Sequence, residues 1–500
     1  MDFKHLKAIF MKKYMYIALT ASLFVACQPE FNDPINEVGY YSSGEADFSN
    51  YVAVGNSLTA GYADNALYLE GQLNSFPSML AERFSLVGGG DFVQPLVNDN
   101  LGGLLASGQQ IQGNRLVLEV GPNSQNPVPI EGTPTTDIAN HLEGSFNNMG
   151  VPGAKSFHLM ANTYGNIGSL PAANPYFIRI ASSSEATVIG DAVAQNPTFF
   201  SLWIGNNDIL SFATSGGVGR DQTGNQNPAS YGSSDITDPD VFANVYNELL
   251  KALTANGAKG AVANIPDVTS IPYFTTVPYN AIPLDQATAD KLNQAYAPYN
   301  GGLQQAALFG AITEEEAAQR TIQFSAGQNP VVLLDEDLTD ITGINPGLTN
   351  MRQATNQDLI PLPVSSVLGT LADPGDAESV IGVAVPLTDG QLLTASEIAL
   401  IVTAQTAYNT TIKAFAQQYK LAFVDIQALM NTLAEAGVSF DGGTITNTFG
   451  TGGAFSLDGV HPTQRGYAVV ANNFINAINT TYKSELPLVN PGSYPTIFVK

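Results

Sequence analysis

A serine and a distant histidine are the residues of this chain whose types and setting suit nucleophilic chemistry. Ser57 follows the run Tyr51–Gly55, which has the composition of a buried strand that ends at a turn. His461 lies three positions after Asp458, near the other end of the chain. A histidine activates a serine by taking its proton, and a carboxylate on the other ring nitrogen fixes the useful tautomer. The three residues could therefore form a Ser-His-Asp triad.

Two further positions could stabilise the negative charge that develops on a carbonyl oxygen under attack. Asn207 comes soon after the apolar run Thr198–Ile204, and its side-chain amide could donate into a cleft. Gly153 lies in a turn-like segment and offers a backbone N–H, and the N–H of Ser57 would be a third donor. Asp208 is expected to cap the short helix that follows, which would leave Asn207 free to point inward.

Each of these residues also has an ordinary structural interpretation. Ser57 could simply N-cap the next helix, as serines at such positions commonly do. Asp458 and His461 could tie the start of the last helix. Asn207 could be a turn residue, and Gly153 a turn or C-cap glycine.

Taken together, these residues fall into four short blocks with a fixed order along the chain. The blocks are Gly-Asn-Ser-Leu at 55–58, Asn-x-Gly-x-x-Gly at 148–153, Gly-x-Asn-Asp at 205–208 and Asp-x-x-His-Pro at 458–462. This order resembles the SGNH hydrolases, also called the GDSL esterase/lipase family. The resemblance implies that Ser57 is the nucleophile, His461 the base and Asp458 its orienting acid. It also implies that the oxyanion donors are the N–H groups of Ser57 and Gly153 and the side chain of Asn207.

The implied activity is carboxylic ester hydrolysis through an acyl-enzyme, without a metal or cofactor. A lipolytic esterase or lipase is favoured, and a carbohydrate O-acetyl esterase is the alternative within the class. A surface lipoprotein that keeps the fold for binding is the alternative of another class. Two features depart from the family pattern or leave it open. Asn56 replaces the aspartate for which the family is named, and Gly150 competes with Gly153 for the place in the second block.

Other motifs do not fit their chemistry. The segment 150–156 resembles a phosphate loop, but Lys155 does not directly follow a glycine. No Gly-x-Ser-x-Gly motif surrounds Ser57, and the four histidines are too scattered for a zinc site. The acidic segment Asp335–Asp340 lacks the glycine and the spacing of a known calcium loop, so a solvated turn is favoured there.

Strands that alternate with helices predict a three-layer α/β/α flavodoxin-like sandwich, with a mostly parallel five-stranded sheet and large insertions. Strands are expected at 51–55, 198–204, 260–265 and 421–426, and helices at 240–256, 394–419 and 463–482. Asp240 is expected to cap the first of these helices. Thr394 and Glu397 have the spacing of a capping box for the second.

The N-terminus has the pattern of an export signal. Residues 1–26 combine a basic start with a short apolar run, and Cys27 is the only cysteine. The segment before Cys27 resembles a bacterial lipobox, which implies a lipid anchor on Cys27 and a place at the outer membrane or cell surface.

The remaining chain is expected to contain three parts, a lipidated tether at 27–49, a hydrolase domain at 50–485 and a tail at 486–500. The domain would carry insertions at about 62–145 and 281–393. The net charge of −25 makes nucleic acid and anionic membrane surfaces unsuitable partners. The expected partners are therefore an ester substrate, and a membrane through the lipid anchor.

Overall fold

The computed structural model describes residues 39–121 and 125–500. The expected signal peptide and the lipid attachment at Cys27 lie outside the described residues. Among the helices of the described part, none has both the length and the apolar character needed to cross a membrane.

Five parallel strands form the central sheet. They are β1 (Tyr51–Gly55), β7 (Asn148–Gly150), β8 (Phe199–Trp203), β9 (Lys259–Ala263) and β14 (Ala422–Val424), in the spatial order β14-β9-β8-β1-β7. Numbered along the chain, this is the 2-1-3-4-5 order of flavodoxin-like folds. The predicted fold class is confirmed, and the sheet is parallel throughout. Strands β1 and β8 are fully buried because helices cover both faces of the sheet.

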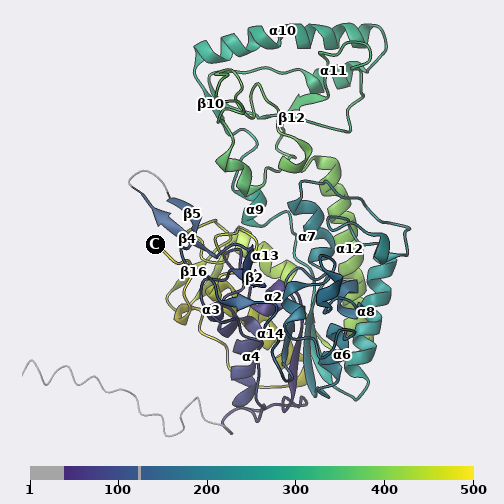
Figure 1. Cartoon of the computed structure of the whole chain (residues 1–500), viewed down its shortest axis with the longest axis vertical. Coiled ribbons are helices and arrows are strands. Elements are labelled where there is room, and N and C mark those ends of the chain that lie inside the picture. Colours follow the sequence, from purple (N-terminus) through teal and green to yellow (C-terminus); the bar gives the residue numbers. More distant parts are fainter. Residues whose placement is uncertain (1–38, 122–124) are drawn as a thin grey trace, which may run out of the picture.

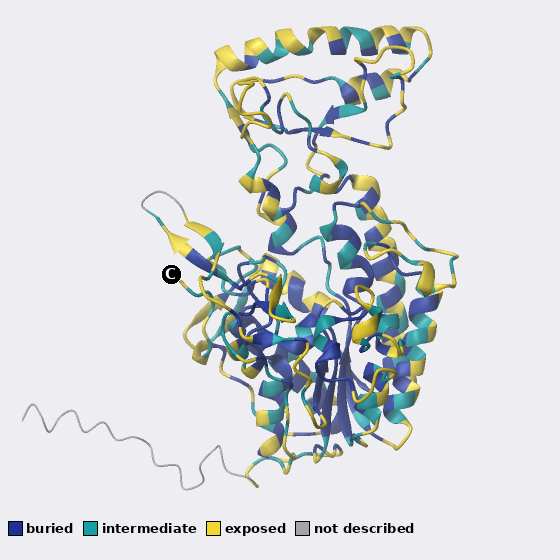
Figure 2. Cartoon of the chain, viewed as in Figure 1, coloured by how far each residue is buried: buried dark blue, intermediate teal, exposed yellow. Residues whose placement is uncertain are grey.

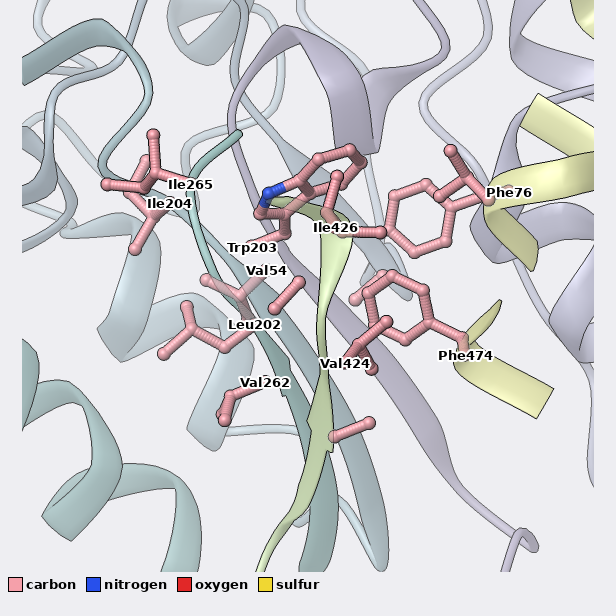
Figure 3. Packing of buried hydrophobic residues seen from close by; sticks show 14 of the residues in the cluster. Val54, Phe76, Leu202, Trp203, Ile204, Val262, Ile265, Val424, Ile426 and Phe474 are labelled. Atoms are coloured by element: carbon pink, nitrogen blue, oxygen red, sulfur yellow. The ribbon is translucent and has the colours of Figure 1, made fainter. Parts of the chain in front are cut away.

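Helices pack on both faces of this sheet (Figure 1). One face carries α4 (Phe76–Ser85) and α14 (Gln464–Tyr482), and the other carries α6 (Val188–Val193), α8 (Pro239–Thr254) and α12 (Ala395–Gln418). The rings of Phe76 and Phe474 stack with their centroids 4.7 Å apart, and Phe76 also meets Trp203 of β8 edge-on (Figure 3). Aromatic packing therefore fixes α4 and α14 against the carboxyl end of the sheet.

Caps define where the main helices begin. Thr394 and Glu397 form the predicted capping box of α12, and Thr463 caps α14. The cap of α8 was expected at Asp240, but Asp238, two residues earlier, is the N-cap, and Pro239 occupies the first helical position. A proline fits there because the first helical N–H needs no partner within the helix.

The segment 62–145 is not wholly an insertion. It begins with α3 (Leu69–Leu73) and with α4, which belongs to the helical layer described above. The part that follows holds short strands, β2 (Leu104–Ala106), β3 (Gln109–Gln112), β4 (Leu116–Val120), β5 (Gln125–Pro129) and β6 (Thr136–Asp137). Strands β4 and β5 form an antiparallel hairpin.

Both ends of the described chain pack on the body. Residues up to 49 were expected to be a tether, yet Phe48 is buried and stacks on Phe84 with centroids 4.1 Å apart. The N–H of Glu45 donates to the carbonyl of Tyr482. At the other end, the last residue, Lys500, donates its N–H to the carbonyl of Leu118 in β4. The folded body therefore starts before residue 50 and includes the expected tail.

Residues 277–392 form a lobe with a hydrophobic core of its own (Figures 1 and 2). Its elements are α10 (Gln286–Leu308), α11 (Glu314–Arg320) and the hairpins β10–β11 (Ile282–Leu284, Gly327–Asn329) and β12–β13 (Val332–Leu334, Met351–Gln353). The guanidinium of Arg352 lies 2.5 Å from Asp335 and 2.7 Å from Asp358, and all three side chains are buried. The expectation of a solvated turn is therefore wrong for Asp335, which is buried in an ion pair.

Candidate active site

Ser57, His461 and Asp458 form one hydrogen-bonded line. Ser57 is the first residue of α2 (Ser57–Ala60), directly after β1 and the N-cap. The Ser57 Oγ lies 2.9 Å from His461 Nε2, and His461 Nδ1 lies 2.9 Å from Asp458 Oδ2. The fold thus brings together residues more than 400 positions apart, at the carboxyl end of the sheet.

The cap of α2 is Asn56 and not Ser57. The Asn56 side-chain oxygen accepts a hydrogen bond of 3.0 Å from the N–H of Leu58. The Ser57 hydroxyl is left to face His461. Gly55 allows this tight arrangement, because a side chain there would overlap Thr59 and the carbonyl of the adjacent strand. An aspartate at position 56 could supply the same cap, so Asn56 in its place preserves the turn.

The Asp458 carboxylate is held by several donors. Its Oδ1 accepts from the N–H groups of Val460 at 2.9 Å and His461 at 2.8 Å and from the hydroxyl of Ser456 at 3.0 Å. Its Oδ2 accepts from the N–H of Asn65 at 2.9 Å, in addition to the His461 ring. Burial alone would raise the pKa of Asp458, but the interactions with His461 lower it to about 2. Asp458 is therefore ionised and binds the histidine in the tautomer whose Nε2 can accept a proton.

Asp64 supports the same loop and was missed in the sequence. Its Oδ1 accepts from the N–H of Leu457 at 3.0 Å, and its own N–H donates to Ser456 Oγ at 2.9 Å. Burial, with the nearby charge of Asp458, raises the pKa of Asp64 to about 6. No local motif marks this role, because Ser456 and Leu457 lie almost 400 positions away from Asp64.

Asn207 lies on the wall of the same pocket as Ser57 and His461, and its side chain contacts Ala154, the neighbour of Gly153. The Asn207 side-chain amide donates one hydrogen bond of 2.9 Å to the carbonyl of Ala154 and retains a second N–H. Gly153 lies in the turn after β7 with φ of +81°, a conformation that favours glycine. Within the described residues, the backbone N–H groups of Gly153 and Ser57 donate to no protein acceptor. Gly150 instead ends β7, where a side chain would overlap Ala60 of α2.

Asp208 was expected to cap α7 (Asn207–Thr214), but it does not. The N-cap position belongs to Asn206, and Asp208 is fully buried. Its carboxylate accepts hydrogen bonds from Ser156, of 2.8 Å from the N–H and 2.6 Å from the hydroxyl. Burial raises the pKa of Asp208, and the bonds from Ser156 oppose that effect. Asp208 thus ties the start of α7 to the segment that carries Gly153.

A pocket opens beside the triad. Ser57, His461 and Asn207 lie on its wall, and most of the remaining side chains around it are apolar. They come mainly from α13 (Ile426–Glu435), from α14 and from the loops before them, and they include Leu210, Val268, Ile271, Ile426, Leu429, Met430, Leu433, Ile445, Phe455, Val469 and Val470. The pocket can therefore take an apolar group attached to the atom that Ser57 would attack.

No protein-family model matches the chain, and no curated protein does. Among solved structures, an extracellular lipase from Streptomyces rimosus aligns with 87% of this chain and 99% of its own. The TM-score is 0.28 and the sequence identity 11%, so this similarity is too weak to support an argument about function.

Proposed function

We propose that this protein is a serine carboxylic ester hydrolase of the SGNH type. The observation that carries the proposal is the line of hydrogen bonds from Ser57 Oγ through the His461 ring to Asp458, each 2.9 Å long. A serine, an imidazole and an ionised carboxylate in this order are the parts needed for nucleophilic attack on a carbonyl.

In this mechanism Ser57 Oγ attacks the ester carbonyl while His461 Nε2 takes the hydroxyl proton. The oxyanion is stabilised by the N–H groups of Ser57 and Gly153 and by the second amide N–H of Asn207. His461 then returns the proton to the leaving alcohol, and an acyl group remains on Ser57. A water molecule, deprotonated by His461, releases the acid and restores the enzyme.

The substrate we propose is an ester with an apolar acyl chain. The pocket wall that includes Ser57 continues into aliphatic side chains and Met430 of α13 and α14, and the aromatic rings of Trp203 and Phe455 also line it. Each buried methylene of an acyl chain would stabilise binding by about 0.8 kcal/mol. An acetyl group on a sugar would leave most of this apolar surface unused, so lipolytic activity is favoured over deacetylation.

A series of nitrophenyl esters from acetate to palmitate, with acetylated polysaccharide beside them, tests the proposal. We expect kcat/KM to rise from acetate to an intermediate chain length, and Ser57→Ala to be inactive on all substrates. Acetylated polysaccharide cleaved in preference to every longer ester would contradict the assigned substrate. A wild-type protein that cleaves nothing would favour the non-catalytic binding role.

We also propose that the protein is exported and lipid-anchored through Cys27. The lipobox-like sequence before this single cysteine supports the proposal. Detergent phase partition of the full chain from expressing bacteria tests it. We expect the protein in the detergent phase and Cys27→Ala in the aqueous phase, and equal partition of both would contradict anchoring.

A further inference from the structure

Three carboxylates from separate segments, those of Glu336, Asp389 and Glu397, converge at one place. Figure 1 shows the lobe of residues 277–392 above the body, with α12 running down from the side of the lobe. Glu336 follows β12, Asp389 starts the short helical turn 389–391, and Glu397 lies in the first turn of α12. One oxygen atom from each carboxylate lies within 4.8 Å of the others. Negative charges this close repel one another unless a cation or protons compensate them.

No basic residue compensates these charges in the part of the chain that the structure describes. None of the three carboxylates forms an ion pair there with lysine, arginine or histidine. The nearby Arg352 is already paired with Asp335 and Asp358. The cluster therefore holds three carboxylates and no basic counter-ion among the described residues.

The Glu397 carboxylate is held by hydrogen bonds to one of its two oxygens, and the other oxygen has no hydrogen-bond partner. Only 7% of the residue is exposed, and its Oε2 accepts from Thr394, 2.7 Å from the N–H and 2.9 Å from the hydroxyl. Its Oε1 is buried without a hydrogen-bond partner. The carboxylate also packs so closely on Gly217 that a side chain there would overlap it. A buried oxygen that accepts nothing is costly, and a bound cation would remove that cost.

We propose that Glu336, Asp389 and Glu397 bind a calcium ion. Oxygen ligands are those that calcium prefers, and its bonds of about 2.3–2.6 Å place opposite ligands about 5 Å apart. The three oxygens lie within 4.8 Å of one another, so one ion can contact all of them. Magnesium needs a stricter octahedron at about 2.1 Å, whereas calcium accepts flexible coordination by carboxylates from separate segments. Water and further oxygen atoms would complete the coordination.

The ion would fasten the lobe to the catalytic body. Glu336 and Asp389 belong to the lobe side, whereas Glu397 belongs to α12, which packs on α7. The first residue of α7 is Asn207, and Gly217, just past its other end, contacts Glu397. The site involves none of the proposed catalytic residues, so it stands whether or not the protein hydrolyses esters.

Calcium titration of the chain without its signal segment, after treatment with EDTA, tests the proposal. Isothermal titration with calcium chloride should show one ion per chain, and thermal unfolding should shift to higher temperature. Glu336→Gln and Asp389→Asn should each weaken the affinity by about tenfold or more, as expected for loss of one charged ligand. Glu397→Gln should do the same, because glutamine keeps the capping box but loses the charge.

Without calcium, two of these variants should be more stable than the wild type. In EDTA, Glu336→Gln and Asp389→Asn should unfold at a higher temperature than the wild type, because they relieve the repulsion. Glu315→Gln, an exposed carboxylate on α11, is the matched control and should change neither measurement. Absence of binding at millimolar calcium, or wild-type affinity in the three ligand variants, would overturn the proposal. An equal response to magnesium would contradict the choice of calcium.

Discussion

At the scale of single residues, the candidate site depends on two aspartates with opposite environments. Asp458 faces the His461 ring and has a pKa lowered to about 2. Asp64, which binds the residue before Asp458, has a pKa raised to about 6. Asp64 binds the backbone of Leu457 and thereby supports the loop that carries the triad acid and base. Asp458 therefore stays ionised well into acid, whereas Asp64 takes up a proton already in mild acid.

Asp64 should make the protein more stable in mild acid. Its pKa rises from an ordinary 3.8 in the unfolded chain to about 6 in the folded protein. The folded state therefore holds the proton more tightly, and this contribution is complete below about pH 4 and lost as pH rises through 6. The difference is on the order of 3 kcal/mol.

Urea unfolding of the wild type and of Asp64→Asn between pH 4 and pH 8 measures this effect. We expect the wild type to lose free energy of unfolding relative to the variant as pH rises across that window. A constant difference between the two proteins would show that Asp64 titrates normally.

At the scale of elements, the contact between Asp208 and Ser156 fixes the position of the Gly153 turn relative to Asn207, and Gly153 and Asn207 are proposed oxyanion donors. Asp208 is the second residue of α7, next to Asn207, and Ser156 follows the turn that carries Gly153. Both donors of Ser156 bind one buried carboxylate. The position of the Gly153 turn relative to α7 thus depends on this link, in addition to the bond from Asn207 to Ala154.

Ser156→Ala should lower kcat more than it changes KM. The variant loses the hydroxyl bond to a charged acceptor, a loss of about 1.5–3 kcal/mol in stability, and it loosens the Gly153 turn. Oxyanion contacts strengthen in the transition state, so their misplacement acts on kcat. Steady-state rates on nitrophenyl butyrate and melting temperatures measure both effects. Ser215→Ala, near the end of α7, is the control, and equal kcat losses in the two variants would reject the link.

The elements were more predictable than their contacts. Strands such as β8 are visible as apolar runs, and the capping box of α12 is a local signal. The order of the sequence blocks correctly anticipated that Ser57 and His461 would meet. The cap at Asn56 could not be predicted, because Asn56 and Ser57 are adjacent and either could cap α2. The roles of Asp64 and Asp208 could not be predicted either, because they depend on residues that are distant in sequence.

At the scale of the whole molecule, two large hydrophobic cores define a body and a lobe, beside two small clusters in the described residues. The flavodoxin-like body holds the triad and the apolar pocket, and the lobe of residues 277–392 has a separate core (Figure 2). The pocket is built from residues between 56 and 470, so no single stretch of sequence predicts it. The lobe emerged in the sequence only as a region of loose pattern, because its helices and hairpins are interrupted by glycine and proline.

The pocket should limit the length of the acyl chain. Leu433→Phe adds volume to the pocket wall on α13 and should lower kcat/KM for decanoate by about tenfold or more, while acetate hydrolysis changes little. Asn431→Phe puts the same ring on the exposed side of α13 and serves as control. Equal losses for both esters, or equal effects of the two variants, would show that acyl chains bind elsewhere.

Covalent labelling tests the central claim, that Ser57 is a nucleophile activated by His461. The protein is incubated with a fluorophosphonate, and intact mass followed by peptide mapping locates the adduct. We predict one adduct on Ser57 in the wild type, none in Ser57→Ala, and labelling slowed by about a thousandfold or more in His461→Ala. A wild-type protein that stays unlabelled, or an adduct on another serine, would contradict the account.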